Sequence, residues 1–201
     1  MPKHYYDRKE NEWIEPYDKK CAKIAHKFSV DEGSCENPQH FTDYLLYNAL
    51  IDAQKGLSVT FVLVKHDEND EPVSIMGYVA LKTSARLQKE ENGFRGEPAV
   101  EISELAVSRD CKGRGIGAAL LNHAVYCCKE IKKWAGVRYL LVYAEKNAEN
   151  FYKHTLKFLN VNSVYEIPHE TWNASCIPMY LDISNSFSSE PVYASEDEEN
   201  E

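Results

Sequence analysis

Short blocks of apolar residues alternate with polar turns along this chain, and they predict a mixed α/β fold. The strand-like blocks are rich in β-branched and apolar residues, and turn residues bound them. The block at 137–144 (VRYLLVYA) is almost wholly apolar, which is typical of a central strand. We expect strands at residues 22–30, 58–66, 73–82, 99–107, 137–144, 158–164 and 177–183.

Apolar positions spaced by three and four residues predict helices between these strands. Residues 40–55 follow this spacing, and Gly56 ends the segment as a helix C-cap does. A longer helix is expected at 115–133 and a short one at 147–156. Strands 58–66 and 73–82 follow each other directly as a hairpin, so the element order differs from a regular parallel alternation of strands and helices.

Three segments lack such periodicity and outline the domain organisation. Residues 1–18 are polar and aromatic and are expected to form an irregular N-terminal extension, and residues 83–98 are expected to form a loop. Residues 184–201 read as an acidic, disordered tail. The length of 201 residues therefore predicts one domain at 19–183 between two extensions.

The net charge of −9 is unevenly distributed. Six of the 32 acidic residues and none of the 23 basic ones lie in 184–201, so residues 1–183 carry 26 acidic against 23 basic side chains. This balance argues against attraction of the whole domain to nucleic acid, but not against a local basic patch. The polar N-terminus has no apolar signal-peptide core, and no apolar run is long enough to span a bilayer, so we expect a cytoplasmic protein.

The cysteines do not indicate a metal site or a disulfide framework. Six cysteines show no CxxC pair and no Cys/His ligand spacing. We expect reduced thiols and no metal.

The most informative segment is a glycine loop between a strand and the long helix, at residues 112–118 (KGRGIGA). Gly113, Gly115 and Gly117 remove side chains where a ligand approaches the backbone. The amides then point from the N-terminus of the helix, where free N–H groups and the helix dipole favour an anion. Arg109, Lys112 and Arg114 add positive charge. The loop therefore predicts a pyrophosphate-binding site.

Two other interpretations of this loop remain open. The glycines could simply allow tight packing of the helix on the strand. Gly113, Gly115 and Ala118 also fit the GxGxxA pattern of dinucleotide-binding folds. Against the second, residues 108–112 separate the motif from its strand, and the unit follows an antiparallel hairpin instead of opening the fold.

Two linked motifs resemble those of the GCN5-related N-acetyltransferase (GNAT) family. The first is 104–107 (ELAV) followed by 112–117 (KGRGIG) and 118–121 (AALL); the second is 148–152 (AENFY), with one strand between them. The resemblance covers residues 20–183 in element order. It implies a mostly antiparallel twisted sheet, splayed between its fourth and fifth strands, with helices on both faces.

The resemblance also implies acetyl-coenzyme A as the co-substrate. The backbones of Leu105, Ala106 and Val107 would bind pantetheine and polarise the thioester carbonyl, an oxyanion-type role. Lys112 stands where the family has Gln or Arg; it keeps the charge but loses bidentate geometry. The phosphates would be held by Lys112 and by the amides of Gly113, Arg114, Gly115, Ile116, Gly117 and Ala118.

By the same resemblance, Tyr152 occupies the position of the general acid, although it also reads as a core aromatic beside Phe151. Glu101 stands where some members carry a general base. Glu104 or a chain of water molecules are the alternatives. Strand periodicity predicts that Glu101 and Glu104 face opposite sides of the sheet. His123 is expected to be structural.

We expect direct transfer of the acetyl group to a primary amine in a ternary complex. One alternative is a toxin-type acetyltransferase acting on aminoacyl-tRNA, which residues 144–148 and the Phe-Tyr helix resemble. Another is a non-catalytic module that binds coenzyme A or a protein partner. A homodimer is a further expectation. The basic residues available for tRNA or another acceptor are Lys19, Lys20, Lys23, Lys27, Arg86, Lys89, Arg95, Arg109, Lys112 and Arg114.

Overall fold

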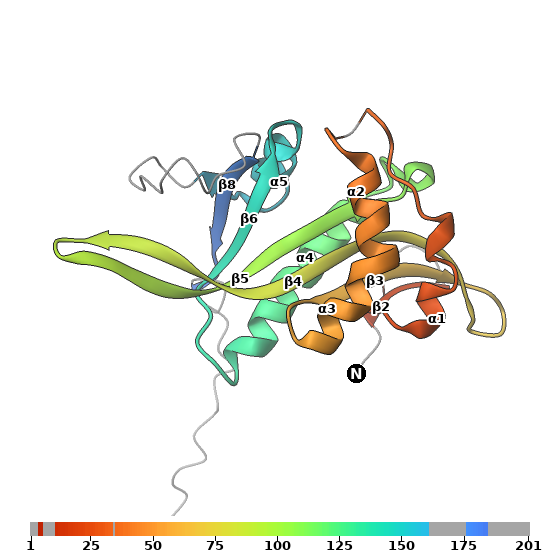
Figure 1. Ribbon diagram of the computed structural model, residues 1–201, viewed down its shortest axis with the longest axis horizontal. Coiled ribbons are helices and arrows are strands. Elements are labelled where there is room, and N and C mark those ends of the chain that lie inside the picture. Colours follow the sequence, from red (N-terminus) through yellow and green to blue (C-terminus); the bar gives the residue numbers. More distant parts are fainter. Residues whose placement is uncertain (1–3, 6–10, 34, 161–175, 185–201) are drawn as a thin grey trace, which may run out of the picture.

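One twisted sheet runs through the molecule and carries helices on both faces (Figure 1). The computed structural model describes residues 4–5, 11–33, 35–160 and 176–184. Within these residues the sheet has eight strands in the order β1-β2-β3-β4-β5-β6-β8-β7. The strands are β1 (His4–Tyr5), β2 (Glu12–Pro16), β3 (Val59–His66), β4 (Pro72–Glu90), β5 (Gly93–Val107), β6 (Tyr139–Glu145), β7 (Leu159–Asn160) and β8 (Cys176–Asp182). Neighbouring strands are antiparallel except β5 and β6.

The helices that follow the first strands lie on one face. The predicted helix at 40–55 is confirmed as a nearly continuous helical run. The side chain of Asn37 caps its N-terminus by accepting the amide of His40, and the run ends at Gly56 in a left-handed conformation. These elements are α1 (Lys19–Ala22), a 3-10 turn (Ala25–Lys27), α2 (Pro38–Asp43), a π-helical turn (Tyr44–Asn48) and α3 (Ala49–Lys55).

The opposite face carries the two later helices, α4 (Ile116–Lys132) and α5 (Glu149–Leu156). A 3-10 turn precedes each of them, at Arg109–Cys111 and at Lys146–Ala148. Both helices were expected from the sequence within a few residues.

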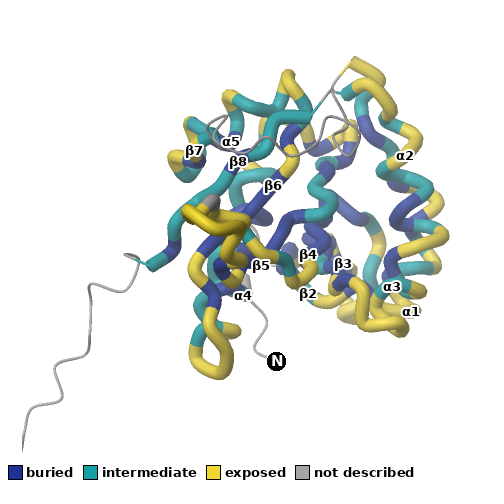
Figure 2. Tube along the Cα trace, turned by 60° about the vertical axis from the view of Figure 1, so that its left-hand side comes forward, coloured by how far each residue is buried: buried dark blue, intermediate teal, exposed yellow. Residues whose placement is uncertain are grey.

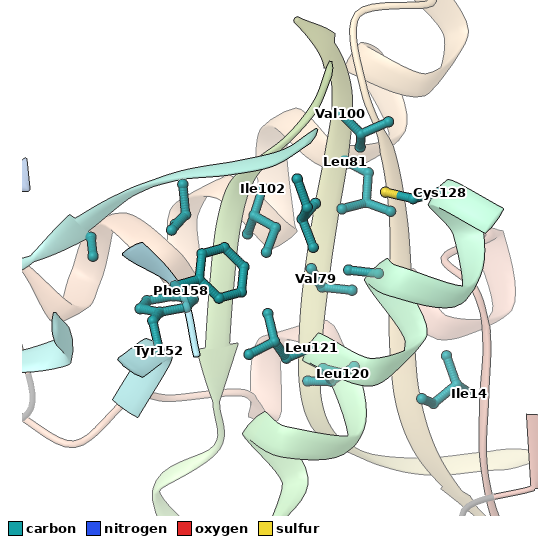
Figure 3. Close-up of a cluster of buried hydrophobic side chains, with 14 of the residues drawn as sticks. Ile14, Val79, Leu81, Val100, Ile102, Leu120, Leu121, Cys128, Tyr152 and Phe158 are labelled. Atoms are coloured by element: carbon teal, nitrogen blue, oxygen red, sulfur yellow. The ribbon is translucent and has the colours of Figure 1, made fainter. Parts of the chain in front are cut away.

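Two hydrophobic cores hold these layers together, one on each side of the sheet. Tyr78, Leu45 and Phe28 belong to the core under α1 to α3. On the other side, α4 and α5 pack on the sheet through side chains such as Leu121 and Phe158 (Figure 3). Figure 2 shows buried residues along the strands and exposed ones on the outer faces of α2 and α3. The buried apolar surface is the main stabilising contribution of such a fold.

The sheet opens between β5 and β6, which correspond to the fourth and fifth of the strands expected from the sequence, as the resemblance implied. The two strands pair only from Ala99–Tyr139 to Ile102–Val142. Beyond this point Glu104–Val107 keeps its pairing with β4, and β6 continues along β8 (Figure 1). One backbone edge of the end of β5 therefore has no strand partner among the described residues.

A β-bulge at the start of this open stretch changes the direction of the side chains. Glu104 lies opposite Ala80, whereas Ile102 lies opposite Leu81, so Ser103 is an extra residue in β5. Glu101 lies opposite Lys82, two residues from Ala80, and cross-strand partners share a face. Glu101 and Glu104 therefore face the same side, and the prediction that they face opposite sides was wrong.

The prediction of a strand at 22–30 was also wrong. This segment contains the end of α1, the 3-10 turn Ala25–Lys27 and no strand, because Asp18 accepts hydrogen bonds from the amides of Lys20 and Cys21 and starts a helix. Cys21, Ala25 and Phe28 are buried at helical spacing.

Two segments expected to be irregular are strands. Residues 83–98 continue β4 and β5 as a long hairpin that projects beyond the sheet (Figure 1). Residues 12–16 form β2, which pairs along β3 and buries Trp13 and Ile14. Long-range pairing decides both, and local composition does not reveal it.

The remaining expectations hold only in part or are not covered. β7 occupies residues 159–160 of the strand expected at 158–164, and residues 161–164 lie outside the described part of the chain. The acidic tail lies outside it as well, apart from Ser184. Among the described helices, none combines the length and apolar character that crossing a membrane requires.

Candidate active site

The glycine loop lies where the splayed end of β5 meets the N-terminus of α4. Gly113 and Gly115 both have a φ of 77°, a left-handed conformation that favours glycine. The amides of Ile116, Gly117 and Ala118 form the first turn of α4, where no intrahelical acceptor is available. These N–H groups and the helix dipole make the end of α4 suited to an anion.

The third glycine serves packing. A Cβ atom on Gly117 would lie 3.2 Å from Cζ of Phe151 on α5. Gly117 thus lets α5 approach the first turn of α4, so the packing interpretation holds for this glycine. Phe151 neighbours Tyr152, and the close contact therefore also fixes Tyr152 relative to the loop.

Each of the three cations of the loop has a carboxylate partner. Lys112 Nζ lies 2.5 Å from Oδ2 of Asp31, and Arg109 lies 4.0 Å from Glu32. Both pairs are exposed, and exposed pairs contribute little to stability and exchange partners readily. Sequence reasoning did not identify these acidic partners, because no local pattern connects residues 31–32 to the loop.

Arg114 points elsewhere. Its guanidinium lies 3.2 Å from the carboxylate of Glu12 on β2, and only 2% of the Glu12 side chain is exposed. The carboxylate of Glu12 raises the pKa of Arg114 through a hydrogen bond, against a smaller opposing effect of burial. The side chain of Arg114 therefore anchors β2, and only its backbone lies at the predicted anion site.

An acidic segment spans the mouth of the splayed strands. We call residues 29–33 and 35–36 the acidic strap. Besides the contacts of Asp31 and Glu32, Ser29 O accepts the amide of Arg109 at 2.8 Å, and the amide of Glu36 donates to Oε2 of Glu145 at 3.2 Å. The acidic strap therefore contacts both the loop after β5 and the end of β6.

Tyr152 is buried in the core on the α5 side of the sheet. Its ring packs against Phe158 with a centroid separation of 5.4 Å (Figure 3), and against Phe151 at 5.1 Å. Burial, and then the negative charges of Glu104 and Glu145, raise the pKa of the Tyr152 hydroxyl well above its usual value. The hydroxyl therefore stays protonated and available as a donor, and the core role and a donor role are compatible.

Glu101 and Glu104 differ in their surroundings. The carboxylate of Glu101 accepts a hydrogen bond from Ser84 at 2.9 Å and lies 2.9 Å from Lys82 Nζ. Glu104 lies 3.0 Å from Nε2 of His40 on α2. Burial raises the pKa of Glu104, and the neighbouring His40 and Lys82 partly oppose this rise. Sequence reasoning did not select His40, because nothing near it in the chain indicates chemistry.

The other sequence candidates are dispersed. His123 is buried on α4 against Phe61, which fits a structural role. Arg86 packs between the rings of Tyr139 and Tyr180, with its Cζ 4.7 and 4.2 Å from their centroids. Lys19 and Lys20 lie in α1, Lys23 follows it, and Lys27 lies in the next 3-10 turn. Lys20 pairs with Glu71 at 2.9 Å. Arg95 is exposed on the hairpin, and the side chain of Lys89 lies outside the described part.

A large apolar groove lies away from the glycine loop, Tyr152 and Glu104. A cavity of about 500 Å³ opens between the C-terminal half of α4 and β3, and Phe61, Tyr126 and Ile131 line it. It shares no residue with the glycine loop, Tyr152 or Glu104. Volume alone is therefore a poor guide to the site here, because a strand edge and a helix N-terminus bind an extended ligand without a deep cavity.

Taken together, the parallel but splayed strands and the glycine loop at α4 define a coenzyme A-dependent acyltransferase fold. The model of the Acetyltransferase (GNAT) family matches residues 22–158, and the chain belongs to this family. It is an acetyl-CoA-dependent acetyltransferase. Among the described residues, no group of three or more His, Cys, Asp or Glu side chains is placed to hold a metal ion.

Individual relatives share this fold. The "tRNA-acetylating toxin" of Mycobacterium tuberculosis is 30% identical over 119 residues, which are 56% of this chain and 68% of the relative. The solved structure of AtaT complexed with acetyl-methionyl-tRNAfMet is 18% identical, with a TM-score of 0.67 and coverage of 86% of this chain and 95% of that one. AtaTR bound with acetyl-CoA is 22% identical, with a TM-score of 0.64 and coverage of 87% and 94%.

Proposed function

We propose that this acetyltransferase transfers the acetyl group to the α-amino group of an aminoacyl-tRNA. The observation that carries the proposal is the 30% identity to a tRNA-acetylating toxin, over a stretch covering 68% of that relative. The solved complex of AtaT with an acetylated aminoacyl-tRNA, which has the same fold, is consistent with it. Such a substrate also agrees with the expected cytoplasmic location.

In this proposal the pyrophosphate of acetyl-CoA lies on the amides of the glycine loop. Positive φ at Gly113 and Gly115, and the free first-turn amides of Ile116, Gly117 and Ala118, support this placement. Arg114 contributes its backbone only. Lys112 contributes its ammonium group once Asp31 releases it.

Pantetheine would lie along the backbone edge of β5 that has no strand partner. Leu105, Ala106 and Val107 pair with β4 on one side only, so the groups on the β6 side are available to an extended ligand. A backbone N–H here would polarise the thioester carbonyl and stabilise the oxyanion that forms when the amine attacks.

Tyr152 would act as the acid for the leaving sulfur. Its hydroxyl stays protonated at neutral pH because burial and two nearby negative charges raise its pKa. The departing thiolate takes this proton, and a proton released from the new amide nitrogen restores the hydroxyl.

The acceptor would reach the cleft from the face that carries Glu101 and Glu104. Side chains of Lys82 and Arg138 on the same side are 42% and 49% exposed. Lys82 lies opposite Glu101 near the start of the open strand edge, whereas Arg138 lies at the other, paired end of β6; both offer positive charge to a phosphate backbone. Glu101 and Glu97 pair with them, so the attraction is local and not a property of the whole surface.

The test is an acceptor panel assayed by release of the coenzyme A thiol and by acetylation of the acceptor. The panel contains charged tRNAs, the same tRNAs uncharged, free amino acids, polyamines and lysine peptides. Acetylation of charged tRNA alone, with an affinity that falls steeply with salt, supports the proposal. Transfer to small amines or peptides with little salt dependence would replace it with an ordinary amine acetyltransferase. Light scattering in the same buffers tests the expected homodimer.

A further inference from the structure

The β-bulge at Ser103 has a chemical consequence. Without this extra residue, Glu104 would face α4, on the opposite side from Glu101. With it, Glu104 faces α2 and meets the imidazole of His40 at 3.0 Å. The bulge lies where β5 separates from β6, so it turns Glu104 at the start of the open strand edge.

The two partners have complementary environments. The side chain of Glu104 is 15% exposed, whereas that of His40 is 51% exposed. His40 lies in the first turns of α2, where Asn37 caps its amide and the Phe41 carbonyl accepts a hydrogen bond from the Tyr78 hydroxyl at 2.8 Å. These contacts hold α2 against the sheet and position the imidazole at the carboxylate.

We infer that the His40–Glu104 pair is the proton acceptor for the attacking amine, with His40 as the base and Glu104 as its positioning residue. This inference rests on the proposed function and names its base. An ionised carboxylate can only accept hydrogen bonds, so the Nε2–H of His40 donates to Glu104. The lone pair of Nδ1 is then available to accept a proton, and Glu104 stabilises the imidazolium that forms.

The proton that leaves the substrate ammonium goes first to a group of the chain and then to water. An N–H bond of the substrate ammonium breaks, and its proton goes to Nδ1 of His40 directly or through one water molecule. The neutral amine attacks the thioester carbon, a C–N bond forms and the C–S bond breaks. His40 then returns its proton to solvent, to which half of its side chain is open.

Glu101 is less suited to this role. Lys82 and Ser84 occupy its carboxylate oxygens, and the half-exposed partner of Glu101 is a lysine ammonium, which has no lone pair to accept a proton as the imidazole of His40 does. Other titratable groups around the pair are Lys82 and Tyr78 on β4 and Tyr152 on α5. Tyr152 comes from the opposite face, so acid and base approach the gap in the sheet from two sides.

The first experiment measures kcat/KM against pH for His40→Gln, with His154→Gln on the exposed part of α5 as the matched control. We expect a loss on the order of 10²-fold for His40→Gln and a pH profile that differs from that of the wild type. Added imidazole should restore part of the activity in His40→Ala, because the site is half exposed. Glu104→Gln should lower kcat more than it raises KM, and Glu101→Gln should have the smaller effect.

A second experiment does not depend on any acceptor. Histidine ring signals of the free full-length chain are recorded by NMR, and Glu104→Gln should change the chemical shifts of the His40 ring and leave those of His154 unchanged. Unchanged kcat/KM and pH profile in His40→Gln, with an active wild type, overturn the inference alone. A wild type that acetylates no amine overturns the proposed function, and the catalytic inference with it. Unchanged His40 ring signals in Glu104→Gln overturn the pairing itself.

Discussion

In the proposed mechanism, Tyr152 would combine a structural and a chemical role in one residue. Its ring completes the core between α5 and the sheet, while its hydroxyl lies within the influence of two carboxylates. The packing of the Tyr152 ring against Phe151 and Phe158 positions its hydroxyl, and a donor that is already positioned loses little entropy when the reaction occurs.

Replacing Tyr152 with Phe should therefore separate the two roles. The ring packing is retained, so the melting temperature should change little, whereas kcat should fall by about 10²-fold or more. Steady-state kinetics with the acceptor identified by the panel, and acetyl-CoA binding by calorimetry, give the measurement. Tyr47→Phe, at a tyrosine that is 65% exposed, is the control. Full turnover in Tyr152→Phe would show that the acid is another group.

Gly113 offers a second test at the scale of one residue, because the chain contains a matched glycine. Gly113 and Gly56 have φ values of 77° and 69°, and a Cβ on either would meet no atom within 4 Å. Alanine should cost each roughly 1–2 kcal/mol of stability through its left-handed conformation. Only Gly113→Ala should also weaken acetyl-CoA binding, measured by calorimetry. Equal affinity in the two variants would mean that the ligand does not approach Gly113.

Among the elements, the acidic strap has the clearest influence on the site. Its carboxylates occupy Lys112 and Arg109, which a bound pyrophosphate would also attract. The lysine holds the pKa of Asp31 below its usual range, so this carboxylate is charged wherever the enzyme works. In the proposed binding mode, the phosphates of acetyl-CoA would therefore have to displace the carboxylates of Asp31 and Glu32.

Asp31→Asn should lower the KM for acetyl-CoA by about two- to fivefold, because an exposed pair is weak. The effect should shrink as salt rises, since salt screens the competition. Glu68→Gln, in an exposed turn far along the chain, removes the same charge and should leave this KM unchanged. A KM that rises in Asp31→Asn would show that the acidic strap assists binding.

At the scale of the whole molecule, residues 12–16 near the N-terminus belong to the sheet. β2 pairs with β3 over Glu12–Pro16, and Glu12 joins it to Arg114 beside the glycine loop. Leaving the buried carboxylate of Glu12 without its partner would destabilise the fold, so the Glu12–Arg114 pair holds β2 and the glycine loop together.

Ile14→Ala should therefore destabilise the protein by about 2–4 kcal/mol, as removal of a buried aliphatic side chain does. Ile14 is 6% exposed and packs in the core under α4. Val59→Ala, at a neighbouring strand position that is 49% exposed, should cost about 0.5 kcal/mol or less. Urea denaturation of both variants measures the difference. An equal cost in the two would mean that β2 packs only weakly.

Much of this architecture follows from local sequence. The periodicity of residues 40–55 and the stop at Gly56, the apolar strands at 58–66 and 137–144, and the glycine loop before α4 all depend on neighbours within one or two turns. The family motifs extended this to the splayed sheet and to Tyr152. The strand at 12–16 and the long hairpin depend on pairing with distant segments, and no local pattern carries that information.

The site shows the same division. The sequence by itself determined the conformation of the glycine loop and predicted an anion there, because glycine conformation and helix dipoles are local properties. Only the tertiary structure decided which carboxylates pair with the cations of the loop: Glu12 with Arg114, Asp31 with Lys112 and Glu32 with Arg109. It also decided that His40 contacts Glu104. The physical reason is that one inserted residue in β5 turns every following side chain to the other face, and strand periodicity alone assumes that no such insertion occurs.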